Sequence, residues 1–147
     1  MAFGRFKEAR AAAKPNPEMD RHINAALNSY HQAFELLPPD AADDLAVTHS
    51  QLGMIYNNVG DIDRALPHYR ESIRYFEAAG DLYHAATARY YVALALAQSG
   101  RLPDAREYAL AALRNFETYG DAAAQDIQKT QQLIAKIDQA IAKGASS

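Results

Sequence analysis

Glycines recur every twenty residues in the second half of the chain. Gly60, Gly80, Gly100 and Gly120 are separated by segments that are each long enough for one helix and a turn. A strict period of this kind is typical of helical repeat proteins. A helix with one apolar face cannot bury that face alone, so its neighbours must stack on it. The spacing therefore predicts a stack of helices with an extended, curved surface.

The repeating unit is a pair of helices, because a shift of forty residues brings many identical residues into register. A helix, a turn and a second helix fit into that length. The matching residues are Gly60, Ala65, Arg74, Phe76, Glu77, Gly80 and Asp81, which recur as Gly100, Ala105, Arg114, Phe116, Glu117, Gly120 and Asp121.

Capping residues and helix breakers set the expected helix boundaries, since acceptor side chains favour helix starts and glycine or proline favours helix ends. Pro67 lies beyond the first turn of its helix and removes a backbone donor, so we expect a kink or a later start there. The expected caps are Asp40, Asp61, Asp81 and Asp121. The expected helices cover 17–37, 41–59, 62–79 and 82–99, a fifth starts at Leu102 before Pro103, and a sixth ends near Lys143.

A single domain is expected from a length of 147 residues and a hydrophobic content of 49%. Its first part, 1–15, is an N-terminal segment or short helix. About two and a half helix pairs follow at 16–121. The remainder is a C-terminal capping helix at 122–143 and a disordered tail at 144–147.

The charge of the chain argues against nucleic acid as a partner. A formal net charge of −3 provides none of the positive field that phosphate backbones select. The chain has no cysteine, so it forms no disulfide and no thiolate zinc site, which fits a reducing compartment. Because no run of residues has the length of a signal-peptide core or a membrane span, we expect no membrane insertion and a cytoplasmic location.

The apolar and small residues within each helix pair follow a known pattern. The first helix carries leucine, glycine, tyrosine and a closing glycine, and the second carries alanine, tyrosine, a small residue and aliphatic residues. One unit contains Leu52, Gly53, Tyr56, Gly60, Ala65, Tyr69, Ser72, Ile73 and Tyr75, and the next has Val92, Ala93, Leu96, Gly100, Ala105, Ala109, Ala112 and Leu113. An earlier second helix matches at Ala26, Tyr30, Ala33, Phe34, Leu36 and Pro38. In this pattern the chain resembles the tetratricopeptide repeat family over roughly residues 23–121.

The resemblance implies an all-α, right-handed solenoid of antiparallel helix pairs, with about six main helices. The unit of forty residues is longer than the family's usual thirty-four. No tryptophan occurs, and the first helix of the first unit is missing or degenerate. The longer unit is similar to the variant found in kinesin light chains and in bacterial signalling regulators. The stretch 115–121 is particularly similar to the bacterial group.

In the tetratricopeptide repeat family, the first helix of each pair lines a concave face that binds partners. The resemblance therefore implies a groove that binds a protein or peptide segment, with aromatic, apolar and amide side chains. Tyrosine suits such a surface, because it offers a large contact area with few rotatable bonds. We expect at least one of Tyr83, Tyr90 and Tyr91 to be core. The candidate groove residues are Asp43, Val47, Ser50, Met54, Asn57, Tyr83, Thr87, Tyr90, Tyr91, Leu94 and Gln98.

One activity of the family is disfavoured. Tetratricopeptide domains that hold the acidic ends of chaperones use lysines, arginine and asparagines on the concave helices. The matching positions here hold Ser50, Met54, Thr87 and Tyr91, which supply no charged donor for a carboxylate.

The last expected helix carries an apolar stripe at intervals of three and four residues. A solenoid must cover its final apolar face, so the stripe predicts a cap on the preceding pair. The alternative is that the stripe pairs with a second copy or a partner helix. The stripe consists of Ile127, Thr130, Leu133, Ile134, Ile137 and Ile141.

Catalysis and cofactor binding find no support in the sequence. The five histidines are dispersed over four expected helices, without the spacing of a helical zinc site, and no glycine-rich phosphate loop occurs. We therefore predict a non-enzymatic adaptor or scaffold that binds a protein or peptide, without metal or cofactor. The alternative is a regulatory or oligomerisation module of a larger bacterial signalling protein, which associates with itself through its terminal helices.

Overall fold

The structure is a computed structural model that describes residues 17–36 and 41–146. The expected segment 1–15, the Asp40 cap and Ser147 lie outside the described residues. The described chain is helical, which confirms the expected all-α fold. The elements are α2 (Pro17–Leu36), α3 (Ala42–Asn58), α4 (Ile62–Ala78), α5 (Leu82–Gln98), α6 (Leu102–Glu117), the short 3₁₀ helix η1 (Gly120–Ala123) and α7 (Ala124–Ser146).

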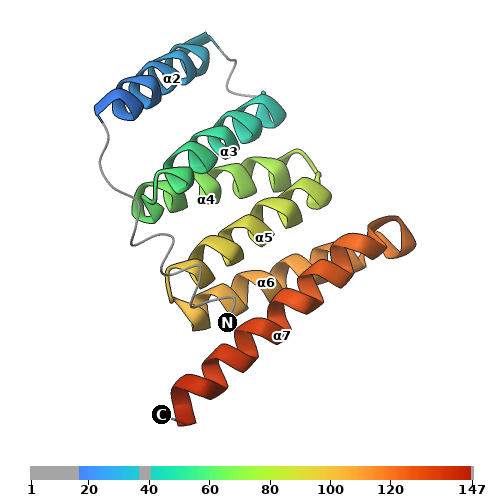
Figure 1. Ribbon diagram of the computed structural model, residues 1–147. Coiled ribbons are helices and arrows are strands. Elements are labelled where there is room, and N and C mark those ends of the chain that lie inside the picture. The colour runs from blue at the N-terminus through green and yellow to red at the C-terminus, as the bar shows by residue number, and fades with distance from the viewer. Residues whose placement is uncertain (1–16, 37–40, 147) are drawn as a thin grey trace.

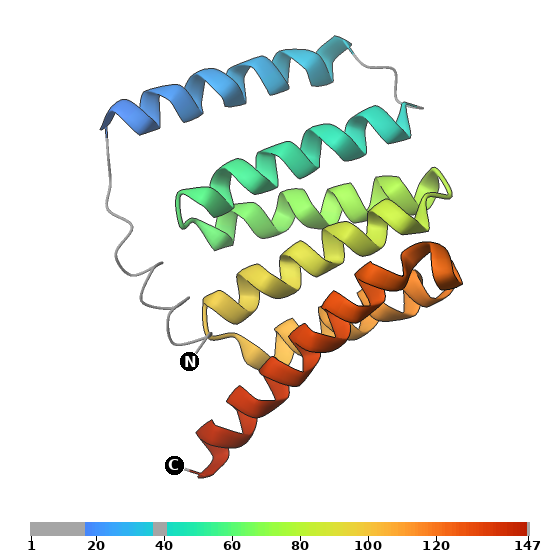
Figure 2. The same ribbon diagram turned by 45° about the vertical axis from the view of Figure 1, so that its right-hand side comes forward.

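The helices form antiparallel pairs that stack in chain order (Figure 1). α3 pairs with α4, and α5 pairs with α6, while α4 and α5 join the two pairs. Figure 2 shows α2 beside α3 at one end of the stack and α7 against α6 at the other. This arrangement is the solenoid of helix pairs that the forty-residue repeat predicts.

The turn after α4 shows why glycine is spaced so regularly. Gly80 has a φ of 76°, a left-handed conformation that glycine adopts without a steric penalty. Its N–H donates to the Glu77 carbonyl at 3.0 Å, and the Asp81 N–H donates to the Phe76 carbonyl at 2.8 Å. These two bonds satisfy carbonyls that the end of a helix leaves without partners. Asp81 then caps α5, because its Oδ1 accepts from the His84 N–H at 3.0 Å.

The sixth expected helix has both of its boundaries displaced in the structure, and the alternative start proposed for the third helix is not found. The sixth helix begins at Ala124 rather than directly after Asp121, because Gly120–Ala123 form the 3₁₀ turn η1. It continues to Ser146, beyond the expected end at Lys143, and Gly144 has no positive φ of the kind that ends the earlier helices. α4 begins at Ile62 despite Pro67, so a later start is wrong. Pro67 is exposed, where water can bond the carbonyl that loses its donor.

Small residues let the helices approach closely. Ala65, Ala85, Ala93, Ala105 and Ala109 are completely buried in one continuous core. Larger apolar side chains fill the remaining space, since protein interiors are close-packed. They include Leu52, Ile62, Tyr69, Ile73, Phe76, Val92 and Leu96.

α7 covers the end of the stack, as capping predicts. Leu133 and Ile137 are 4% and 0% exposed, and Ile134 and Ile141 pack against the same core. Thr130 is buried as well, and its hydroxyl donates to the Asp126 carbonyl at 2.6 Å. The apolar stripe of α7 is therefore used within the chain.

Candidate functional site: two adjoining pockets beside α5

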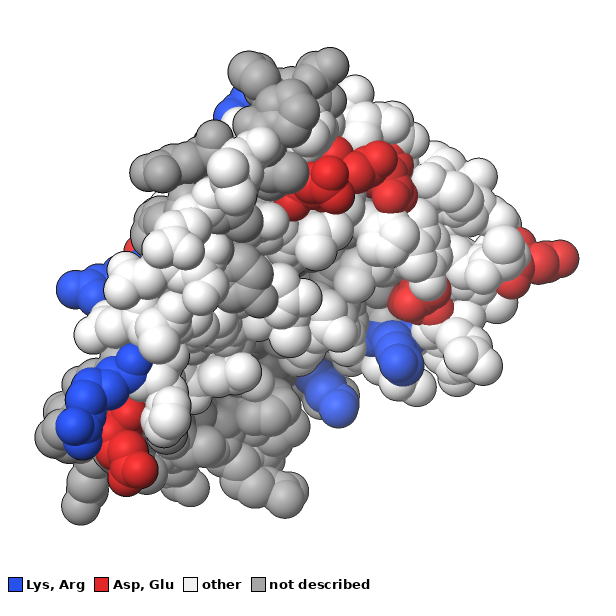
Figure 3. Space-filling view, turned by 90° about the horizontal axis from the view of Figure 1, so that it is seen from above, with Lys and Arg blue, Asp and Glu red and all other residues white. Residues whose placement is uncertain are grey.

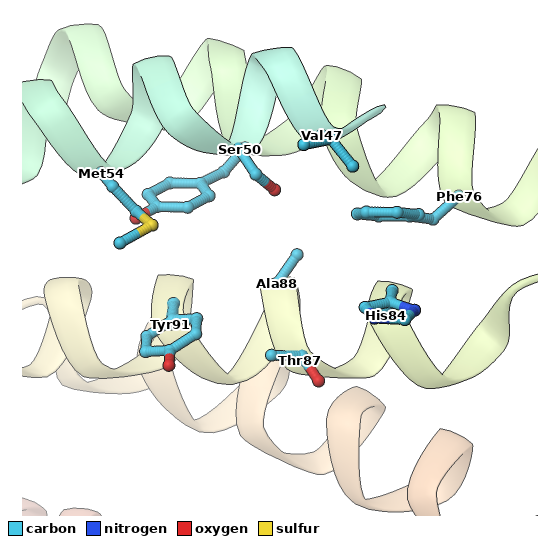
Figure 4. A pocket seen from close by; sticks show the side chains of 9 residues that line it. Val47, Ser50, Met54, Phe76, His84, Thr87, Ala88 and Tyr91 are labelled. Carbon is cyan, nitrogen blue, oxygen red and sulfur yellow. The ribbon is translucent and has the colours of Figure 1, made fainter. Parts of the chain in front are cut away.

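A pocket of about 200 Å³ lies between the first helix pair and α5. Figure 4 shows Val47, Ser50 and Met54 on α3 across the pocket from the α5 side chains. Tyr69 and Phe76 reach it from α4, and both are nearly fully buried. The α5 side chains that line the pocket are His84, Thr87, Ala88 and Tyr91.

The first pocket is lined mainly by apolar groups, and two of the hydroxyls at its wall already have partners. The Ser50 hydroxyl is hydrogen-bonded to the Ser72 hydroxyl at 2.6 Å, and the Thr87 hydroxyl donates to the Tyr83 carbonyl at 3.1 Å. Val47, Met54 and Tyr91 remain 48%, 41% and 44% exposed around it. Exposed large apolar side chains around a hollow are typical of binding sites.

Tyr69 forms part of the pocket wall and remains uncharged far above neutral pH. Burial, with a smaller contribution from Tyr91, raises the pKa of Tyr69 to about 12. Burial disfavours the phenolate, because a charge loses its hydration there. Tyr69 therefore contributes a neutral aromatic surface to the pocket at physiological pH.

A second pocket, of about 70 Å³, adjoins the first on the other side of α5. Thr87 and Tyr91 line both pockets. α7 supplies the opposite wall of the second pocket, although the sequence predicts only a capping role for that helix. The remaining lining residues are Tyr90, Phe116, Asp126, Lys129 and Thr130.

The structure brings six of the eleven candidate groove residues to these pockets. Five line the first pocket and Tyr90 lines the second. The six are Val47, Ser50, Met54, Thr87, Tyr90 and Tyr91. The other five, which line neither pocket, are Asp43, Asn57, Tyr83, Leu94 and Gln98.

Tyr83 has a structural role at the start of α5. Its hydroxyl donates to Asp126 Oδ2 at 2.7 Å, and its backbone N–H donates to the Tyr119 hydroxyl at 2.9 Å. The bond to Asp126 raises the pKa of Tyr83, because the carboxylate favours the protonated phenol. Tyr83 thereby joins α5 to α7 and to the turn before α7.

Sequence reasoning missed the residues that form the interior of the first pocket and the α7 wall of the second. His84, Thr87, Ala88 and Tyr91 recur at intervals of three, one and three residues, so they lie on one face of α5. That spacing could have indicated His84 and Ala88. Tyr69 and Phe76 were less accessible to sequence reasoning, because their positions follow the core pattern.

Two histidines that are distant in sequence meet away from these pockets. His49 Nδ1 on α3 lies 3.1 Å from His68 Nδ1 on α4. The His49 ring stacks with Tyr75, and the His68 ring stacks with Tyr56. One ring must donate and the other accept, so the pair links the two helices. Within the described chain, no group of three or more histidine, cysteine, aspartate or glutamate side chains could hold a metal ion.

Charged side chains are distributed without a basic patch on the described part of the face seen in Figure 3. Acidic atoms form one band in the upper part of the view and separate groups at the right and the lower left, and basic atoms lie in separate places. Phosphate backbones select continuous positive surfaces. None of the described helices has the length and hydropathy needed to cross a membrane.

The helix pairs and the two pockets define a class of protein, a short solenoid of antiparallel helix pairs with a grooved face. A family model described as tetratricopeptide repeat matches residues 44–118, just over half of the chain. The chain belongs to the tetratricopeptide repeat family. Comparison with curated proteins and with solved structures finds no match. Tetratricopeptide repeats generally mediate protein–protein interactions as adaptors or scaffolds, and the family is typically non-enzymatic.

Proposed function

We propose that this protein is an adaptor that binds a segment of another protein along α3, α5 and α7. A bulky apolar side chain of that segment enters the first pocket. The observation that carries this proposal is the combination of exposed apolar walls and hydroxyls that are already bonded within the chain. Such a pocket offers an apolar ligand contact area, and its Ser50 and Thr87 hydroxyls keep their partners when a ligand excludes water.

The size of the pocket suits one large side chain. Transfer of a leucine or phenylalanine side chain from water into an apolar site stabilises a complex by about 1.5–3 kcal/mol. Further affinity comes from the limited entropy cost of binding to a preformed surface. Tyr69, Phe76 and Ala88 are buried, which supports a pocket that exists before the ligand arrives.

The test introduces a charge into the first pocket. Peptides that bind the wild-type chain are selected from a random peptide library, and their dissociation constants are measured by calorimetry. We expect Met54→Lys to weaken binding by about tenfold or more, because a lysine ammonium is costly to bury against an apolar ligand. Met54 is 41% exposed, so the free protein tolerates the lysine.

The matched control is Gln51→Lys, which adds the same charge to an exposed position of α3 outside both pockets. Circular dichroism verifies that both variants keep the helical content of the wild type. Equal affinities for the wild type and Met54→Lys would show that the selected peptides bind elsewhere, and the proposal would then be wrong.

A further inference from the structure

The contact between His49 and His68 brings two nitrogens of a metal-ligating residue type together. His49 lies on α3 and His68 on α4, and their Nδ1 atoms are 3.1 Å apart. The residues are nineteen positions apart, so the spacing rule for two histidines on one helix does not apply to them. Both side chains are partly exposed, and neither lines a pocket. Water and dissolved ions can therefore reach the pair without entering the groove.

The distance between the two nitrogens is close to that of two ligands on one ion. Metal–nitrogen bonds of about 2.0–2.1 Å place two nitrogens about 3.3–3.4 Å apart in a tetrahedral site and about 2.8–3.0 Å apart as neighbours in a square-planar site. The 3.1 Å between the two Nδ1 atoms lies between these spacings. A small change of ring orientation therefore lets both nitrogens face one ion.

Aromatic stacking holds both rings in place. The His49 ring stacks with Tyr75 at an interplanar angle of 12°, and the His68 ring stacks with Tyr56 at 9°. The two histidine rings are themselves 5.4 Å apart between centroids. Ligands that are already fixed lose less conformational entropy when they bind an ion. The stacking therefore favours binding at this pair over binding at a single exposed histidine.

The charges around the pair are compatible with a bound cation. Glu71 lies one helical turn after the α4 histidine, and its pKa is lowered mainly by the hydrogen bond from Arg74. Burial opposes this shift, while the charges of Arg74 and of the two histidines add to it, so the carboxylate is within electrostatic range of both rings. Arg64, which lies 5.9 Å from the centroid of the Tyr56 ring, is paired with Asp61 at 3.4 Å. Carboxylates therefore offset the charges of both arginines.

The protonation of the rings limits which ions the pair can bind. A neutral imidazole ligates a metal through its unprotonated nitrogen. The ring that donates the present hydrogen bond must therefore take the tautomer with its proton on Nε2, which leaves its net charge unchanged. Imidazole suits zinc, copper, iron and nickel, whereas magnesium and calcium prefer oxygen ligands. The pair is therefore suited to a divalent transition ion.

We propose that His49 and His68 bind a single divalent transition ion through their Nδ1 atoms, which joins α3 to α4 by a metal bridge. Within the part of the chain that the structure describes, no third histidine or carboxylate completes the site, so its other positions are open to water. The ion exchanges with solution, unlike one held by the four protein ligands of a structural zinc site. Copper(II) binds more tightly than zinc(II), because nitrogen sites follow that order. This proposal is independent of the proposed function, since the pair lines neither pocket.

The test measures the binding of copper and zinc to the untagged, metal-free full chain by calorimetry. We expect a single copper ion per wild-type chain and no binding of magnesium. His68→Asn should weaken copper binding by about tenfold or more, because one of the two ligand nitrogens is lost. Asparagine carries a donor and an acceptor, so it can keep a hydrogen bond to His49. Circular dichroism and urea denaturation verify that the variant is folded.

Electron paramagnetic resonance of the bound copper identifies its ligands directly. The wild-type spectrum should show coupling to two nitrogens, and the His68→Asn spectrum should show coupling to one. A purely structural role of the pair would not produce this difference. The matched control is His22→Asn, which removes an exposed histidine of α2 outside both pockets. It should leave the copper affinity and the nitrogen coupling unchanged.

Three results would overturn the proposal. Equal copper affinities of the wild type and His68→Asn would mean that the ion binds elsewhere. Coupling to a single nitrogen in the wild type would exclude a bridge between the two rings. Dimers that form only with copper, detected by light scattering, would mean that the ligands come from two copies of the chain. None of these results affects the peptide-binding test, because that test is carried out without metal.

Discussion

At the scale of single residues, the contact between Gly53 and Tyr69 limits how closely α3 and α4 can approach each other. A Cβ atom built on Gly53 would lie 3.0 Å from three ring atoms of Tyr69. Both residues are buried, so neither the α3 backbone nor the ring has much space to move. Tyr69 also lines the first pocket, which links this contact to the shape of that pocket.

We therefore expect Gly53→Ala to destabilise the protein. Replacing glycine by alanine in a helix normally stabilises by about 1 kcal/mol, whereas overpacking a core costs about 1–3 kcal/mol. The net loss in the free energy of unfolding should be about 1 kcal/mol, measured by urea denaturation. The same substitution in a Tyr69→Leu background should lose less, because the ring is absent. A more stable Gly53→Ala variant would contradict the contact.

At the scale of the helices, the glycine turns and the caps at Asp61 and Asp81 were predictable because their signals are local, whereas the expected cap Asp121 lies within η1. The glycines at positions 60, 80, 100 and 120 all have a positive φ, and Asp61 and Asp81 cap the helices that follow. α7 was only partly predictable. Its apolar stripe indicated a cap. Its match to α5 was obscured, because the corresponding residues, such as Thr87 and Lys129, lie forty-two rather than forty residues apart. The wall that it adds to the second pocket is a tertiary contact that periodicity does not reveal.

The turn at Gly80 provides a test of backbone conformation alone. Nothing lies within 4 Å of a Cβ built there, so any cost of Gly80→Ala comes from the φ of 76°. We expect a loss of about 1–2 kcal/mol in the free energy of unfolding. Gly80→Asn should lose less, because asparagine tolerates this conformation better. Gly144→Ala is the control, since Gly144 has equal space but lies in α7 without a positive φ; it should not destabilise.

At the scale of the whole molecule, the fold was predictable from the sequence and the detailed site was not. The glycine period and the recurring small residues specify helix pairs, and stacking follows from the need to bury their apolar faces. The pockets depend on side chains from three or four helices at once. Tyr69, Phe76 and Ala88 are core residues by pattern, and only the packed structure shows that they also line a pocket.

We expect the isolated chain to be monomeric in light scattering at micromolar concentration. The alternative of self-association through the last helix needs an available apolar stripe, whereas Leu133 and Ile137 are buried against the chain's own core. A dimer would instead favour the alternative function of the chain, an oligomerisation module. Ile134→Glu is informative in that case, because a half-buried position of α7 should affect a dimer formed through that helix.

Residues forty positions apart line the two pockets, as Ser50 and Tyr90 do, and Phe76 and Phe116. This repetition has a consequence for the evolution and redesign of the surface. Val47, Met54 and Lys129 line the pockets from exposed positions, so a substitution at one of them would change a pocket and leave the buried core as it is. Tyr90→Ser combined with Lys129→Thr would give the second pocket the residues that stand at Ser50 and Thr87 in the first. Under the proposed function, selectivity can therefore evolve one ligand position at a time, and a further helix pair would add another pocket.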